Sequence, residues 1–205
     1  MTERKSNYEL QAESVRELFL QWDQAEMIER FDLRYDEMSL YIEFFRETFA
    51  VNRDTGVITK AESGEAAGVN AVMSICDMLC DARDDARLTG EWRMLQALSP
   101  HSNFRTDAAN HYSATAKRLE PHLAQVERMC ETLGERIDGK ADIEYRVEAF
   151  PFLPMIFRFW CGDEDFDAKA DFMFDAGTLS YVHFETAWYI AGHFVELLQG
   201  IINAQ

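Results

Sequence analysis

The strongest strand signal in this chain comes from residues 141–175, which read ADIEYRVEAFPFLPMIFRFWCGDEDFDAKADFMFD. Polar and apolar residues alternate over 141–150, and a largely apolar run follows at 153–160 after a bend bracketed by two prolines. Residues 169–175 have similar strand character. Because alternation with a period of two places every second side chain on the same face of a sheet, this region predicts three consecutive strands.

The closing segment, residues 183–202, is apolar nearly all round. A helix at the surface has one apolar stripe, whereas a helix that is apolar on every side belongs in the interior. We therefore expect a helix over this segment, packed centrally against the sheet.

Upstream of these strands the apolar residues recur first with helix spacing and then with strand spacing. Residues 7–29 carry an apolar stripe at steps of three and four, which predicts an amphipathic helix. Strands are predicted over 39–45 and 47–53, with a turn and a short strand at 57–59 behind them. The segment FDLRYD, 31–36, is a candidate for a further strand of the same meander.

Two helical segments separate this meander from the C-terminal strands. Helix spacing returns at 64–86 and at 107–134, where Pro121 breaks or kinks the segment and Gly134 is a candidate C-cap. Helix, strands, helices, strands and helix in this order indicate an α+β fold. We predict one domain over 1–205, in which antiparallel strands pack against several helices and the apolar C-terminal helix is central.

The charge of the chain is strongly negative, with 37 acidic and 20 basic residues and a formal net charge of −17. Aromatic residues make up 13% of the chain, enough material for a core, which excludes a disordered acidic chain. An anionic surface without a cluster of Lys and Arg repels phosphates, so nucleic acid and anionic membranes are excluded as main partners. A cation or a basic partner protein suits this charge better.

The location expected from the sequence is the cytoplasm. No stretch approaches the roughly 20 apolar residues of a membrane-spanning helix, and MTERKSNYEL at the start lacks the apolar core of a signal peptide. The four cysteines, Cys76, Cys80, Cys130 and Cys161, are then expected to be free thiols. Cys76 and Cys80 lack the CxxC spacing of zinc and iron–sulfur sites, which favours two buried core residues over a shared metal.

Acidic residues concentrate in residues 161–175, which hold six Asp or Glu and one Lys. Four of these residues have the spacing of ligands one, three, five and nine of an EF-hand-like calcium loop: Asp163, Asp165, Asp167 and Asp171. Ala168 and Phe174 stand where such a loop needs a glycine and a bidentate glutamate. The alternative is a solvated turn whose carboxylates cap neighbouring amides.

The predicted last helix carries four polar residues of interest, His183, Glu185, His193 and Glu196. His193 and Glu196 are three apart and share a helix face, which suits a metal site, a proton relay or a pair of satisfied core groups. Glu185 falls in the first turn, where the helix dipole stabilises its negative charge. The aromatic residues crowded between 150 and 184 suit either an apolar pocket or ordinary core.

Several unusual features occur in a fixed order in the C-terminal third of the chain. They are Pro151 and Pro154, the acidic turn 162–166, the strand end Phe174-Asp175, and Glu185 at the start of the last helix. This order resembles an uncharacterised domain-of-unknown-function family, family 3786, found largely in anaerobic bacteria and archaea. Weaker similarity extends back to the helix that carries Cys76. The resemblance implies a shared fold but no substrate, because that family has no settled activity.

Some members of that family carry an extra N-terminal region whose four cysteines bind an iron–sulfur cluster. The present sequence has no such region, so the resemblance implies no cluster here. It also contains no GxGxxG, P-loop, GxSxG or HExxH motif, which leaves common nucleotide-binding, hydrolase and zinc-peptidase chemistry without support. We assign no metal ligand from the sequence, and the cofactor is unknown.

Our first functional hypothesis is a non-enzymatic protein that binds a small molecule or a cation. The binding region is the acidic turn 162–175 together with the start of the last helix. The candidate ligand-binding residues are Asp163, Glu164, Asp165, Asp175 and Glu185.

Two alternatives belong to other functional classes. The first is an enzyme in which Asp163, Asp165 and Glu185 supply the general acid and base, which requires carboxylates in unlike environments along one cleft. The second is an interaction module or homo-oligomer, whose exposed aromatic residues mark the contact.

Overall fold

The structure is a computed structural model that describes residues 7–98 and 112–203. The helices of this part are α1 (Asn7–Phe19), α2 (Gln24–Phe31), α3 (Val69–Asp81), α4 (Ser113–Leu119), α5 (Leu123–Leu133) and α6 (Phe184–Asn203).

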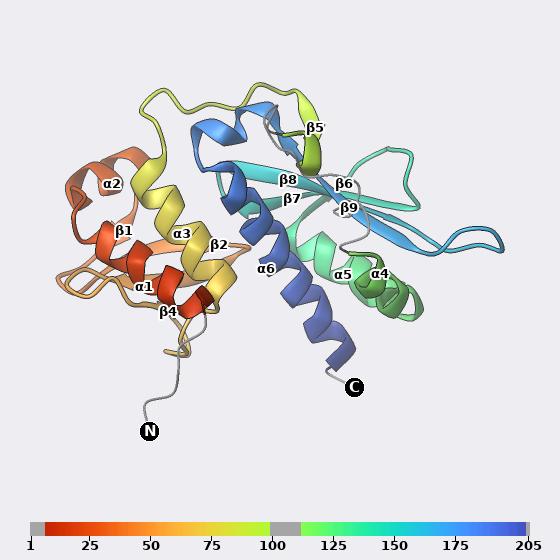
Figure 1. Cartoon of the computed structure of the whole chain (residues 1–205), viewed down its shortest axis with the longest axis horizontal. Helices are drawn as coiled ribbons and strands as arrows, with labels where there is room; N and C mark the ends of the chain where they lie inside the picture. Colours follow the sequence, from red (N-terminus) through yellow and green to blue (C-terminus); the bar gives the residue numbers. More distant parts are fainter. Residues whose placement is uncertain (1–6, 99–111, 204–205) are drawn as a thin grey trace.

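The strands form two antiparallel sheets (Figure 1). The smaller sheet has the order β1-β2-β3-β4, with β1 (Arg34–Tyr35), β2 (Ser39–Phe44), β3 (Glu47–Asn52) and β4 (Ile58–Lys60). The larger sheet has the order β5-β9-β8-β7-β6, with β5 (Trp92–Met94), β6 (Gly134–Arg136), β7 (Ile143–Phe150), β8 (Leu153–Trp160) and β9 (Lys169–Asp175). The three strands predicted from residues 141–175 are β7, β8 and β9. The α+β prediction is confirmed.

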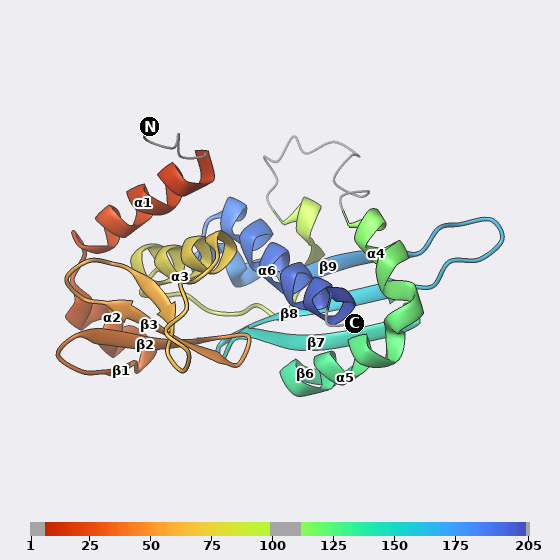
Figure 2. The same ribbon diagram turned by 90° about the horizontal axis from the view of Figure 1, so that it is seen from below.

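Helices α3 and α6 lie on the same side of the two sheets (Figure 2). Helix α6 contacts α3, α4 and α5, and the sheets meet where β2 contacts β7. The prediction of a central, apolar C-terminal helix is therefore confirmed. Within 7–98 and 112–203, no helix combines the length and the apolar character required to cross a membrane.

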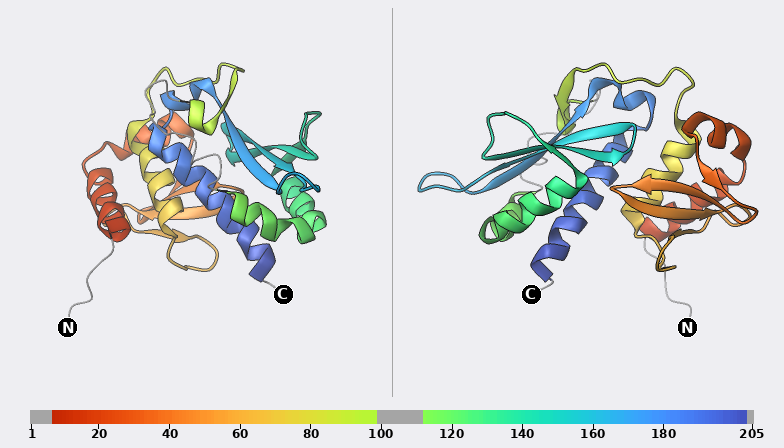
Figure 3. Two further views of the ribbon diagram at one scale, coloured as in Figure 1. Left: turned by 45° about the vertical axis from the view of Figure 1, so that its right-hand side comes forward. Right: turned by 180° about the vertical axis from the view of Figure 1, so that it is seen from behind.

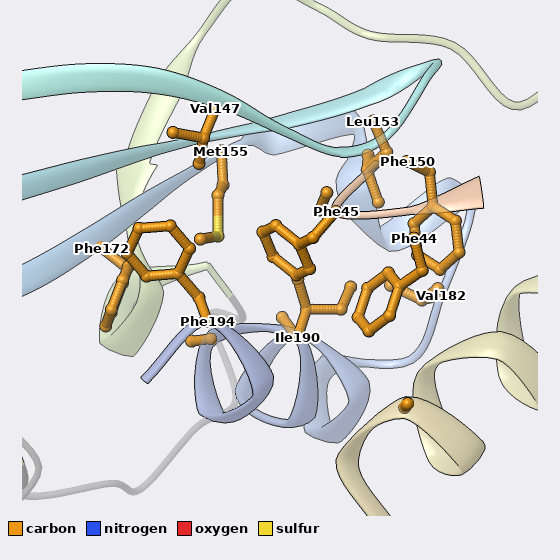
Figure 4. Close-up of a cluster of buried hydrophobic side chains, with 14 of the residues drawn as sticks. Phe44, Phe45, Val147, Phe150, Leu153, Met155, Phe172, Val182, Ile190 and Phe194 are labelled. Atoms are coloured by element: carbon orange, nitrogen blue, oxygen red, sulfur yellow. The ribbon is translucent and has the colours of Figure 1, made fainter. Parts of the chain in front are cut away.

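The core is centred on aromatic side chains around α6 (Figure 4). The ring of Phe194 on α6 lies 5.0 Å from Phe157 and 5.8 Å from Phe172 of the larger sheet, measured between ring centroids. The same ring lies 5.7 Å from Phe45, which follows strand β2 of the smaller sheet. All four side chains are buried. These contacts join the two sheets to α6 in one core. Burial of one such side chain contributes roughly 1.5–3 kcal/mol to stability.

The prediction of one continuous helix over 7–29 was wrong, since two helices occupy this region. Asp23 adopts an extended conformation, and its carboxylate accepts a hydrogen bond from the backbone N–H of Ala25 at 2.8 Å. A residue in this conformation caps a new helix, so it ends the path of the old one. The helix predicted over 64–86 forms in its middle part, as α3.

The helix predicted over 107–134 begins outside the described residues. In its described part, α4 ends at Leu119, one 3-10 turn spans 120–122, and α5 begins at Leu123. The interruption contains Pro121, as predicted, because proline lacks the N–H that an α-helix needs at this point.

Candidate metal centre

The five site residues predicted from the sequence are divided among the loop before β9, the end of β9 and the start of α6. Asp163, Glu164 and Asp165 are exposed in the loop between β8 and β9, which projects from the body of the molecule (Figure 3). Asp175 ends β9, and Glu185 is exposed in the first turn of α6. Because an extended strand of this length spans about 20 Å, the loop carboxylates and Asp175 stand at opposite ends of β9 and do not share a cleft.

Two of the four carboxylates of the β8–β9 loop, those of Asp163 and Asp167, are engaged within the loop or with α4. Asp163 Oδ1 accepts hydrogen bonds from the backbone N–H groups of Asp165 at 2.9 Å and Phe166 at 2.8 Å. Asp167 pairs with Lys117 of α4 at 2.8 Å. This is the amide-capping turn that the sequence offered as the alternative to a calcium loop.

One of the four aspartates that have the spacing of a calcium loop lies outside the β8–β9 loop. Asp171 belongs to β9, where its side chain is 3% exposed and pairs with Arg158 at 2.8 Å and Lys169 at 3.1 Å. Because this carboxylate is buried in the larger sheet, it does not converge with the exposed carboxylates of the loop.

Asp175 joins the segment before β5 to the end of β9. Its Oδ1 accepts hydrogen bonds from the N–H of Thr89 at 2.8 Å, the Thr89 hydroxyl at 2.9 Å and the N–H of Gly177 at 2.6 Å. Its Oδ2 accepts one from the N–H of Gly90 at 2.6 Å. Burial raises the pKa of Asp175, but these hydrogen bonds outweigh it and hold the pKa below the usual value. The geometry indicates a structural role.

A different group of polar side chains converges where α3 ends and α6 begins. Asp77 and Asp81 are four residues apart on α3, which places them on one helix face. His183 immediately precedes α6, and its Nδ1 lies 2.7 Å from Asp77 Oδ1 and 3.8 Å from Asp81 Oδ2. The backbone N–H of His183 donates to Asp77 Oδ2 at 2.8 Å.

This group, called the α3–α6 group below, has the composition of a metal site. Across the described parts of the chain it is the one set of three or more His, Cys, Asp or Glu whose ligand atoms lie within 4.8 Å of one another. The side chain of Asp77 is 11% exposed and that of His183 is 63% exposed. One ligand is therefore fixed by packing, while an ion has access from solvent.

The charges of the α3–α6 group favour a cation. Two carboxylates face one imidazole, and the only ion pairs that the described residues give these carboxylates are with His183. Burial raises the pKa of Asp81, and a hydrogen bond with Asp77 and the charge of Asp77 raise it further. The hydrogen bond with Asp77 raises the pKa of His183. The C-terminus of α3 adds the negative end of a helix dipole.

The spacing of these atoms suits a small ion. Zinc binds nitrogen and oxygen ligands at about 2.0–2.1 Å in a tetrahedron, which separates neighbouring ligand atoms by about 3.3 Å. In the structure His183 Nδ1 is hydrogen-bonded to Asp77 Oδ1 at 2.7 Å and lies 3.8 Å from Asp81 Oδ2, so a bound ion would take the place of that hydrogen bond. Three protein ligands leave the fourth position for water, as in zinc sites that remain open.

Reasoning from the sequence missed this group because its halves are far apart in the chain. The helix spacing of 64–86 does place Asp77 and Asp81 on one face, which was the available signal. His183 lies 106 positions after Asp77, so only the packing of α3 on α6 brings the imidazole to them.

Three of the other candidate ligands from the sequence, Cys76, Cys80 and His193, are buried in the core. Cys76 and Cys80 are buried and unpaired, as predicted, and burial raises the pKa of the Cys76 thiol to about 12. His193 is buried, and its ring lies 4.7 Å from that of Phe44, while its Nδ1 is 3.3 Å from Glu196 Oε2. The ring contact indicates packing of His193 in the core, whereas Glu196 is exposed and accepts a hydrogen bond from Asn70 at 2.7 Å.

The sequence matches a protein family over most of its length. The family is described as a domain of unknown function (DUF3786), and the match covers residues 23–197, which include the whole α3–α6 group. The chain belongs to this family, which confirms the resemblance predicted from its sequence. No curated protein and no solved structure matches the chain.

Proposed function

We propose that this member of the DUF3786 family binds a divalent transition-metal cation through Asp77, Asp81 and His183. The proposal keeps the cation hypothesis drawn from the sequence and moves it from the β8–β9 loop to the α3–α6 group. The observation that carries it is the convergence of one imidazole and two carboxylates without a balancing Lys or Arg among the described residues.

The ligand types favour particular ions. Imidazole suits zinc, iron, nickel and copper, whereas a site for calcium or magnesium is built from oxygen ligands alone. One nitrogen and two carboxylate oxygens therefore favour Zn²⁺, with Mn²⁺ or Fe²⁺ binding more weakly at the same site. A bound ion links the end of α3 to the start of α6 and so stabilises the packing of these helices.

Calorimetric titration of the metal-free protein with Zn²⁺, Mn²⁺ and Ca²⁺ tests the proposal. We expect one Zn²⁺ per chain, a lower affinity for Mn²⁺ and no binding of Ca²⁺. Asp77→Asn and His183→Gln each remove one ligand, and we expect each to weaken Zn²⁺ binding by more than about 100-fold. Asn at position 77 retains an acceptor for the backbone N–H of His183, so the local fold is kept.

The matched control is a chain with the double substitution Asp163→Asn and Asp165→Asn. It removes two exposed carboxylates from the β8–β9 loop and leaves the α3–α6 group intact. Zinc affinity should equal that of the wild type. If this double variant loses the ion while Asp77→Asn retains it, the site lies in the loop, and absence of any bound ion in the wild type rejects the proposal.

We also propose a cytoplasmic location and partners other than nucleic acid. The location is supported by the four cysteines, which are unpaired, and the choice of partners by the net charge of −17. A homo-oligomer is a further candidate, which light scattering coupled to size-exclusion chromatography tests directly.

A further inference from the structure

A groove on the outer face of the smaller sheet lies apart from the α3–α6 group. This outer groove consists of two adjoining hollows of about 440 and 540 Å³, which share Arg34. Leu40 and Ile42 of β2 are buried, while Tyr41 and Glu43 alternate with them and line the outer side. The right-hand view of Figure 3 shows this sheet from behind.

Arg34 is placed to bind an anionic group. It pairs with Tyr41 across β1 and β2, and its guanidinium carbon lies 3.8 Å from the centre of the Tyr41 ring. Within the described residues, no ion pair or hydrogen bond engages this guanidinium, which stacks on the ring and whose charge also acts on the nearby carboxylate of Asp36. A guanidinium stacked by its face keeps its edge donors free, and they match the two oxygens of a carboxylate.

A free carboxylate stands near Arg34 on the same face. Glu43 is two residues beyond Tyr41 on β2 and is therefore the diagonal neighbour of Arg34, at about 7–8 Å between backbone positions. Glu43 is exposed, and the described part of the chain provides it with no ion pair. The first hollow is thus lined by one arginine, Arg34, and two carboxylates, Asp32 and Glu43, and Arg34 and Glu43 lie at a separation that a single small molecule spans.

An apolar wall borders these charges. The rings of Phe31, at the end of α2, and Phe152, in the turn between β7 and β8, stack with centroids 4.9 Å apart, and Pro151 continues the wall. The backbone N–H of Phe45 donates to the carbonyl of Ala149 at 2.7 Å. This bond holds the turn against the smaller sheet, so that both sides of the groove are fixed.

We infer that the outer groove binds a small zwitterion of the α-amino acid class with an apolar side chain. Arg34 holds the carboxylate of the ligand, Glu43 holds its ammonium group, and the side chain lies against Phe31 and Phe152. A hollow of about 440 Å³ falls within the range of small-molecule sites.

The mixed charge of the groove selects against simpler ions. A ligand with only negative charge meets four carboxylates that line the two hollows, those of Asp32, Glu43, Glu47 and Glu62. A ligand with only positive charge meets Arg34 and Arg46. A zwitterion pairs with Arg34 and Glu43 at once. A ligand with a single charge leaves one of these two side chains unpaired, which weakens its binding.

Calorimetry with L-leucine and L-phenylalanine tests the inference. The protein is treated with chelator and no metal is added, so that a failure of the metal-binding proposal does not affect the result. N-acetyl-L-leucine and L-leucinamide each lack one of the two charges. We expect at least one amino acid to bind with a Kd below about 1 mM, and the analogues at least about tenfold more weakly.

Three variants separate this site from unspecific binding. Arg34→Gln and Glu43→Gln alter exposed side chains, so circular dichroism should show an unchanged fold, and each should lose amino-acid binding by at least about tenfold. Arg93→Gln is the control, because Arg93 on β5 is a partly exposed arginine that pairs with Glu91 outside the groove. Its affinity should equal that of the wild type.

Three results would overturn the inference. They are no binding of either amino acid up to about 10 mM, equal affinity for the amino acid and its two analogues, and unchanged affinity in both groove variants.

Discussion

The carboxylate of Asp175 illustrates how a single residue of this protein is used. Reasoning from the sequence placed it in a ligand site because it is acidic and ends a strand. In the structure its side chain is buried, and it accepts hydrogen bonds from Thr89, Gly90 and Gly177. Charge and position along the chain were predictable, whereas the donors came from segments that only the fold brings near.

Asp175→Asn tests this structural role through its pH dependence. The pKa of Asp175 is lower in the folded than in the unfolded chain, so its contribution is present above the unfolded value of 3.8 and lost as the pH falls through the folded pKa. We expect the variant to be about 1.5–3 kcal/mol less stable at neutral pH. We also expect the difference from the wild type to shrink below about pH 4 in urea denaturation experiments.

Asp165→Asn is the control for this measurement, because Asp165 is an exposed carboxylate of the β8–β9 loop. Its free energy of unfolding should stay within about 0.5 kcal/mol of the wild type. A difference between Asp175→Asn and the wild type that is independent of pH would contradict the assignment.

At the scale of secondary-structure elements, Gly134 sets the distance between α5 and β7. It ends α5, as predicted, and its N–H bonds to the carbonyl of Cys130. Its φ of −179° is open to any residue, so space and not conformation requires glycine here. A Cβ at this position collides with the backbone carbonyl of Arg146 and lies 2.8 Å from the Cα of Val147.

Gly134→Ala should therefore lower the free energy of unfolding by about 1–3 kcal/mol, because backbone atoms of β7 have to move. Gly200→Ala on α6 is the matched control, since a Cβ there meets nothing within 4 Å. It should be neutral or stabilising by up to about 1 kcal/mol, because alanine favours a helix. Equal effects of the two substitutions in thermal unfolding would show that the close approach is unimportant.

Strands β8 and β9 are also linked by an ion pair between Arg158, whose side chain is 18% exposed, and the buried Asp171. Arg158→Met removes a partner of this buried carboxylate and leaves it, among the described residues, only Lys169, at 3.1 Å. We therefore expect the free energy of unfolding, measured by urea denaturation, to fall by about 3 kcal/mol. Arg146→Met, which removes an exposed pair with Glu135, should cost less than about 1 kcal/mol. Similar losses in both variants would place the Arg158 pair among ordinary surface contacts.

At the scale of the whole molecule, α6 couples the two sheets. Phe194 contacts aromatic rings on both sides, so Phe194→Ala should lower the free energy of unfolding by about 3–5 kcal/mol. Hydrogen exchange should show the same loss of amide protection in β2 and β8, as expected if the two sheets belong to one domain. Phe166→Ala, at a side chain that is 74% exposed, should change stability by less than about 0.5 kcal/mol. Protection that falls in β8 alone would contradict the coupling.

Local patterns in the sequence were sufficient for most of the secondary structure. The alternation over 141–175 predicted β7, β8 and β9, and the apolar segment 183–202 predicted α6, because periods of two and 3.6 involve neighbours in the chain. The same reasoning made 7–29 one helix, since an apolar stripe continues through Asp23 and conceals the cap that begins α2. Patterns of this kind determine elements and their apolar faces.

The candidate sites depended on tertiary structure. Asp77 and His183 meet because α3 packs on α6, and Arg34 and Glu43 face the same groove because β1 and β2 pair in one register. The acidic turn, the most conspicuous feature of the sequence, precedes β9 and projects from the body of the molecule, away from the start of α6 (Figure 1). Charge density is a local property of the chain, whereas convergence of ligands is a property of packing between segments that are distant in it.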